Sequence, residues 1–202
     1  GIQVQSATVI LGSQNLVAVL GIVTAVGSMI SMALCPLLIK KLNERNAYIL
    51  LSVYGFAASV FSFVIGHFWF KSPENTVLTV LFYISLFLIG LQFGAVTLMP
   101  MIMTADTVDY YEYETGKRME GACYSILTLT IKVCLALGTA VGLIFVQKSG
   151  YYEALSTGSF TNGTKDIIFF AYTALPGILA LLSIVPMFKY DIVGEKKANI
   201  SN

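Results

Sequence analysis

The chain has 202 residues, of which 56% are hydrophobic and 11% are charged, and its formal net charge is +1. Soluble domains carry about 25% charged residues, so a chain this poor in charge cannot cover a water-exposed surface. The composition therefore excludes a soluble domain and predicts an all-α, polytopic membrane helix bundle. The near-neutral charge gives no sign of a nucleic-acid partner.

Five apolar segments are long enough to cross a bilayer, which takes about 20 residues of helix. They are expected at residues 16–39, 46–66, 76–104, 121–147 and 167–189, and a polar tail follows at 190–202. Residues 1–12 are shorter and are interrupted by polar side chains, so they are expected to end a truncated span. The chain starts with Gly1 and shows no signal-peptide pattern. We therefore expect part of a longer protein, and this count of spans fits a six-helix half of a transporter.

Lysine and arginine are unevenly divided between the two ends of these spans. One end has Lys40, Lys41, Arg45, Lys117, Arg118, Lys189, Lys196 and Lys197, and the other has Lys71, Lys148 and Lys165. Basic loops stay preferentially in the cytoplasm. We therefore expect the C-terminus to be cytoplasmic, in a multi-pass protein of a bacterial inner membrane.

Small residues predict close helix packing at two places. Gly90 and Gly94 are four residues apart, and so are Gly138 and Gly142. This spacing places two small residues on one helix face, where a neighbouring backbone can approach closely. Both pairs are expected to pack helices together.

Residue types that make metal or catalytic sites are scattered. The three cysteines lie in separate apolar segments without metal-site spacing, and His67 stands beside aromatic residues typical of a membrane interface. No nucleophile–base pair is apparent at depth. The sequence favours a protein that is not an enzyme and has no metal or cofactor.

A charged segment at residues 104–121 lies between two apolar spans. It contains Asp106, Asp109, Glu112, Glu114, Lys117, Arg118 and Glu120. Asp106 and Asp109 are three residues apart and share a helix face, and a Thr115-Gly116 break lets Arg118 fold back towards them. Such pairs could close a cytoplasmic gate, or they could be the weak surface pairs of a solvated loop.

Lys132 lies inside the span predicted at 121–147, eleven residues beyond Gly121, or about 16 Å along a helix. A lysine at this depth costs about 2.5–3.5 kcal/mol on insertion scales. The acidic residues of the chain all fall in loops, in the tail or at span ends. Lys132 is therefore expected to face a watery cavity or a carboxylate in another part of the protein, the alternative being a hydrated or neutral structural lysine.

Other polar residues at depth could line a cavity with Lys132. Thr128 precedes Lys132 by four residues and shares its helix face, with Tyr124 a further turn away. Gln92 and Thr97 lie at depth on the span predicted at 76–104. These groups could bind a polyhydroxylated solute, or they could form hydrogen bonds between helices.

The charged segment resembles a known family signature. Ala105-Asp-Thr-Val-Asp-Tyr110, Glu112-Tyr113, Thr115-Gly-Lys-Arg118 and Glu120-Gly121 resemble the motif of the glycoside–pentoside–hexuronide:cation symporters, the melibiose-permease-like branch of the major facilitator superfamily. The resemblance covers nearly the whole chain as the C-terminal six-helix half. Lys132 falls where that family has a lysine in its eleventh span.

The resemblance implies roles for particular residues. Asp106, Asp109, Arg118 and Glu120 would form a cytoplasmic gate, and Lys132 would lie near the sugar and cation sites. By the resemblance, Thr128 would line the sugar cavity, whereas Tyr124 and Gln92 are candidates only by their position in the spans. Thr97 stands where melibiose permease has a sugar-stacking tryptophan, so that contact would differ here. The family's cation-binding aspartates lie in the N-terminal half.

The expected function is symport of a sugar or glycoside with sodium, a proton or lithium, by alternating access. The expected partners are the substrate, the coupling cation, an N-terminal six-helix half and the lipid bilayer. The alternative within the superfamily is a transporter of a lipid or another amphipathic solute. An integral-membrane enzyme and a non-transporting structural or sensor module are rivals from other classes.

Overall fold

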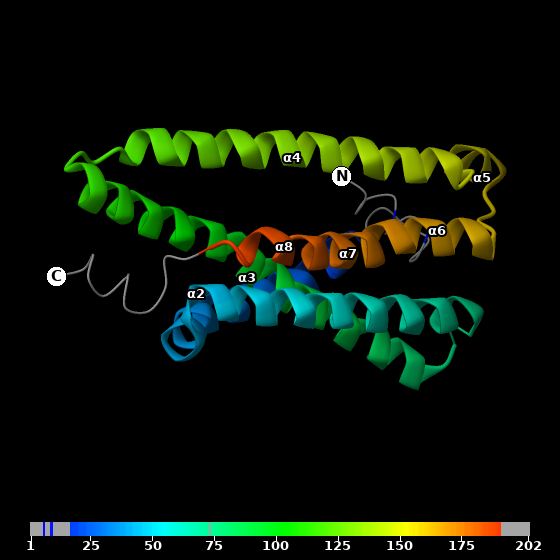
Figure 1. The fold of residues 1–202 in the computed structure, drawn as a ribbon. Helices are drawn as coiled ribbons and strands as arrows, with labels where there is room; N and C mark the ends of the chain where they lie inside the picture. The colour runs from blue at the N-terminus through cyan, green and yellow to red at the C-terminus, as the bar shows by residue number, and fades with distance from the viewer. Residues whose placement is uncertain (1–5, 7–8, 10–16, 73, 191–202) are drawn as a thin grey trace.

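A computed structural model describes residues 6, 9, 17–72 and 74–190, and this part of the chain is almost entirely helical (Figure 1). The helices are α2 (Val17–Lys71), α3 (Thr76–Thr115), α4 (Glu120–Lys148), α5 (Tyr151–Thr157), α6 (Asn162–Tyr172), α7 (Ala174–Leu182) and α8 (Ile184–Met187). Four helical stretches of the described part are long and apolar enough to cross a membrane: Leu20–Lys71, Thr76–Thr115, Glu120–Lys148 and Asn162–Met187. The predicted all-α membrane helix bundle is confirmed.

The long helix α2 contains both of the first two predicted spans. Its backbone departs from helical geometry at Asn43, where φ is 64° and ψ is 162°, a combination that is strained for residues other than glycine. Cys35 before this bend and Ala47 after it are buried together with Met99 of α3. The two arms of α2 therefore pack against each other beside the bend, and the short charged loop expected between them is helical on both sides of Asn43.

Glycines bring α2 and α3 into backbone contact. A Cβ at Gly90 would overlap the carbonyl oxygen of Thr24, and one at Gly94 would overlap that of Ser28. Because a single methyl group would collide with backbone atoms, these positions need glycine for the two helices to pack this closely. The packing role predicted for this pair is confirmed.

The last predicted span is divided into short helices by two prolines. Pro176 lies four residues after the end of α6 at Tyr172, and Pro186 lies four residues after the end of α7 at Leu182. A proline lacks an N–H for the carbonyl four residues earlier and clashes with it. The loop expected at 148–166 is also partly helical, since it holds α5 and the start of α6.

Helix α4 stands apart from the packed core and lies uppermost in Figure 1. The core of the described part joins α2, α3 and α6 around Phe82, Leu86 and Phe169. By contrast, the buried residues of α4 are Gly142 and Val146, near its C-terminal end. Most of α4 therefore presents its side chains to the surroundings.

Most residues of the first and last predicted segments lie outside the part of the chain that the structure describes. Of the expected truncated span at 1–12, Ser6 and Val9 are described, and both are buried. Val9 packs with Val146, Tyr151 and Ile168 at the C-terminal end of α4. Of the expected tail at 190–202, the structure describes Tyr190.

Candidate functional site

The charged segment is mainly the end of a helix rather than a loop. Helix α3 continues to Thr115 and ends at Gly116, whose φ is 68° and whose N–H donates to the carbonyl oxygen of Glu112 at 2.8 Å. A left-handed glycine at this position is a common helix C-cap. The chain then reverses within residues 116–119 before α4 begins. The charged segment at 104–121 therefore consists of the end of α3, a four-residue turn and the first residues of α4.

Arg118 joins the two helices through three carboxylates. Its Nη1 lies 2.7 Å from Glu112 Oε2 and 3.6 Å from Asp109 Oδ1, and its Nε lies 3.3 Å from Glu120 Oε2. Hydrogen bonds to Glu112 and Glu120, with their negative charges, raise the pKa of the guanidinium. All four side chains are about half exposed, so the cluster is accessible to water. The sequence predicted that Asp109, Arg118 and Glu120 would come together but did not include Glu112, although Glu112 follows Asp109 at helical i, i+3 spacing.

Asp106 lies in a second cluster rather than with Arg118. Burial, followed by the negative charges of Asp106 and Glu44, raises the pKa of Tyr190. The i, i+3 spacing put Asp106 on the face of Asp109, but the structure brings it to the α2 bend and the segment after α8. Sequence analysis missed Glu44 and Tyr190 here, and the 5% exposure of Glu44 could not be read from a short charged loop.

Arg45 also belongs to this region. Its guanidinium carbon lies 6.0 Å from the centroid of the Phe188 ring, within the range of a cation–π contact. Together with the Asp106–Glu44–Tyr190 cluster, this contact ties the segment after α8 to the bend of α2 and to α3. The α2 bend and the α3–α4 turn both lie at the left end of the helices in Figure 1, so the two clusters are at the same end of the molecule.

A polar groove runs along one face of α4. Tyr124, Thr128 and Lys132 follow one another at four-residue spacing, and with Ser125 and Leu129 they line a groove of about 430 Å³. The Thr128 hydroxyl donates to the carbonyl oxygen of Tyr124 at 2.8 Å. Its lone pairs remain available to accept a hydrogen bond. Lys132 is exposed and has no ion pair with any described residue.

The two site residues predicted on α3 have different environments. Gln92 is 5% exposed and packs against Gly55 of α2. It therefore does not reach the groove of Lys132, and its predicted place in that cavity is corrected to a helix-packing position. The Thr97 hydroxyl is exposed and donates to the carbonyl oxygen of Phe93 at 2.7 Å.

Phe93 marks a second, mainly apolar groove of about 850 Å³ between α3, α4 and the α6–α7 segment. From α4 it is lined by residues that include Ile131, Leu135 and Gly138. Thr97 follows Phe93 by one helical turn and shares its face of α3. The structure thus brings Thr97 towards the α4 side of the molecule, and Gln92 towards the closed α2–α3 side.

Comparison with known proteins identifies the family. A family model described as MFS/sugar transport protein matches residues 6–194. The putative sulfoquinovose importer of Escherichia coli K12 is 26% identical over 97% of this chain and 39% of its own length. The glucuronide carrier protein homolog of the same strain is 27% identical over 93% of this chain and 38% of its length.

A shorter match is somewhat more similar. The inner membrane symporter YicJ of Escherichia coli K12 is 31% identical over 63% of this chain and 27% of its length. No solved structure matches the chain significantly. The chain spans less than two fifths of the length of these curated relatives. With the family model covering almost all of it, the chain belongs to the sugar transport proteins of the major facilitator superfamily, as its resemblance to the glycoside–pentoside–hexuronide:cation symporters indicated.

Proposed function

We propose that the protein is a cation-coupled symporter of a sugar or glycoside, and that this chain forms its C-terminal half. The observation that carries the proposal is Lys132, an exposed lysine on an apolar helix long enough to span a bilayer, with no ion pair to a described residue. The family match and relatives named as a sulfoquinovose importer and a glucuronide carrier support a sugar as the substrate class.

The position of Lys132 favours a water-filled path over a lipid-facing surface. An ammonium group in the middle of a bilayer costs about 2.5–3.5 kcal/mol on insertion scales unless it meets water or a partner. The groove beside it carries the hydroxyl groups of Tyr124, Ser125 and Thr128. A solute rich in hydroxyls can exchange hydrogen bonds with such a surface, so we place the sugar path along this face of α4.

The remaining parts of the site belong to the other half of the transporter in this proposal. A carboxylate there would pair with Lys132 and bind the coupling ion, which would be sodium, lithium or a proton. Transport would proceed by alternating access, in which the two halves rock about a midplane site. The Arg118 cluster would act as a cytoplasmic gate, because half-exposed ion pairs are weak enough to break and reform as the helices move.

Uptake by the full-length protein tests this proposal. Replacing Lys132 by Gln is expected to abolish accumulation of a radiolabelled glycoside in cells, while the amount of protein in the membrane stays unchanged. Lys148→Gln, at the C-terminal end of the same helix, is the matched control and should retain accumulation. Normal accumulation by the Lys132 variant would refute the role given to this residue.

A lipid or another amphipathic solute is the second candidate substrate. The mainly apolar groove between α3, α4 and the α6–α7 segment, about 850 Å³ in volume, favours it. Parallel uptake assays with a glycoside panel and a labelled lysophospholipid would separate the two. If the protein takes up the lysophospholipid but none of the glycosides, the lipid replaces the sugar as the proposed substrate.

A further inference from the structure

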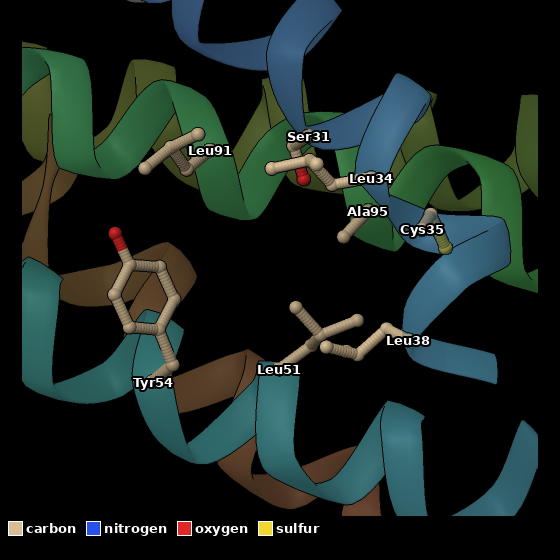
Figure 2. Close-up of a pocket in the computed structure, with 8 residues that line it drawn as sticks. All are labelled: Ser31, Leu34, Cys35, Leu38, Leu51, Tyr54, Leu91 and Ala95. Atoms are coloured by element: carbon tan, nitrogen blue, oxygen red, sulfur yellow. The ribbon is translucent and has the colours of Figure 1, made fainter. Parts of the chain in front are cut away.

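A separate pocket lies between the two arms of α2 and the middle of α3 (Figure 2). Its volume is about 210 Å³, and its walls carry Leu34 and Leu38 from the first arm, Leu51 from the second and Leu91 from α3. Figure 2 shows these side chains around a common space, together with Ala95 and Cys35. The pocket is on the closed α2–α3 side of the molecule and shares no lining residue with either groove of α4.

The chemistry of this pocket does not suit a sugar. The Tyr54 hydroxyl donates to the carbonyl oxygen of Leu88 at 3.1 Å, and most of the lining is aliphatic. Cys35 and Ala95 are buried, whereas Leu34 at the rim is 52% exposed. The pocket therefore opens past Leu34 onto the outer surface of the helices, and an apolar chain is the occupant that its lining favours.

Positive charge lies where the pocket approaches the α2 bend. Leu34, Leu38 and Lys41 follow one another at i, i+4 and i+7, so they share one face of the first arm. Lys41 is one turn nearer the bend than Leu38, and its neighbour Lys40 is exposed as well. Within the described residues neither lysine forms an ion pair. The nearby carboxylate of Glu44 is buried, so the charge exposed beside the pocket is positive.

We propose that this pocket binds an acyl chain of an anionic phospholipid whose phosphate lies against Lys40 and Lys41. The leucine-lined space receives part of the chain, and the helix face from Leu34 to Lys41 leads from that space to the bend. This face is about 10 Å long at 1.5 Å per residue, so the apolar and basic parts of the site are separated along α2 as the tail and headgroup of a lipid are. A basic site between helices attracts anionic headgroups over zwitterionic ones.

Tryptophan quenching by brominated lipids tests the site in the full-length protein. The reporter is Leu34→Trp at the pocket rim, with Trp69 and any tryptophan outside this chain replaced by Phe. In liposomes, dibrominated phosphatidylglycerol should quench this reporter at a lower mole fraction than dibrominated phosphatidylcholine. Lys40→Gln and Lys41→Gln should each lower that preference about fivefold, the effect expected for one lysine near an anionic lipid.

Lys71→Gln, at the other end of α2, is the control for general charge attraction and should leave the preference unchanged. Both tested lysines are exposed, so these variants are expected to fold. Ser31→Phe, which would fill the pocket, should reduce quenching by both lipids. Equal quenching by the two lipids, or a preference for phosphatidylglycerol that survives both lysine substitutions, would overturn the proposal.

Discussion

Gly90 and Gly94 of α3 lie against the backbone of α2, whereas a Cβ of Gly138 on α4 would have no described atom within 4 Å apart from the adjoining part of its own helix. The two helices also differ in burial, with 39% of the most apolar part of α3 buried and 11% of that of α4. The same four-residue glycine spacing therefore brings α3 into contact with α2 but borders an open groove on α4. The spacing alone does not tell a helix-packing glycine pair from one that lines a groove.

The α2–α3 side of the molecule is closely packed, whereas the α4 side is open and carries the residues proposed to contact the solute. On the α2–α3 side, the buried hydroxyl groups of Ser62 and Ser85 form a hydrogen bond, with their oxygens 3.0 Å apart. On the α4 side, Lys132 has no ion pair with a described residue, and its neighbouring hydroxyls line an open groove. The residues proposed to line the sugar path thus gather on α4, the least buried of the four helical stretches long enough to cross a membrane.

After the complete loss expected for Lys132→Gln, the largest effect is expected from breaking the Arg118 cluster where α4 begins. Arg118→Gln should lower glycoside accumulation by about tenfold or more, within the 5–150-fold range of coupling between distant sites. The reason is that one guanidinium holds three carboxylates from α3 and α4. Lys117→Gln, which changes the same net charge on the neighbouring residue, should have little effect on accumulation. Similar losses in both variants would show that only the overall charge matters.

The glycine comparison predicts a difference in stability. Gly94→Ala should lower the free energy of unfolding by about 1–3 kcal/mol, because the new methyl group would overlap the carbonyl oxygen of Ser28. Gly138→Ala should leave it unchanged or raise it by about 0.5–1 kcal/mol, since alanine favours a helix. Denaturant unfolding followed by tryptophan fluorescence in detergent measures both. An equal loss at the two positions would contradict the open environment of Gly138.

The smallest effect is expected at a histidine–carboxylate contact between α2 and α6. His67 Nδ1 lies 2.9 Å from Asp166 Oδ1 and links α2 to α6. Because both side chains are partly exposed, Asp166→Asn should cost only about 0.2–1 kcal/mol of unfolding free energy. Lys165→Gln, which changes the charge of the preceding residue, is the control. If its Tm equals that of Asp166→Asn, the contact between His67 and Asp166 is not stabilising.

Hydrophobic patterning predicted the helix bundle because membrane spans depend on long apolar runs. It also placed the break between the first two spans, where Asn43 adopts a positive φ. It did not predict the breaks inside the last span, because these depend on single positions such as Pro176, which acts on the carbonyl of a residue one turn earlier. The charged segment was expected to be a loop because of its polarity, but α3 continues to the left-handed Gly116.

Spacing was also an incomplete guide to the candidate site. It grouped Tyr124, Thr128 and Lys132 correctly on one face of α4, because these contacts are local in sequence. It did not place Gln92 against Gly55 or Asp106 near Tyr190, since both depend on how separate helices pack. A polar residue at depth can serve either helix packing or solute binding, and only the tertiary arrangement distinguishes the two.

The central claim, that α4 lines the solute path while the α2–α3 side is closed, is tested most directly by cysteine accessibility. In the full-length protein with its native cysteines replaced, Thr128→Cys should react with a small, membrane-impermeant thiol reagent. A transported glycoside should slow that reaction. Ser85→Cys, buried between α2 and α3, should not react under the same conditions. An unreactive Thr128→Cys beside a reactive Ser85→Cys, or a reaction at Thr128→Cys that no transported solute slows, would contradict the account.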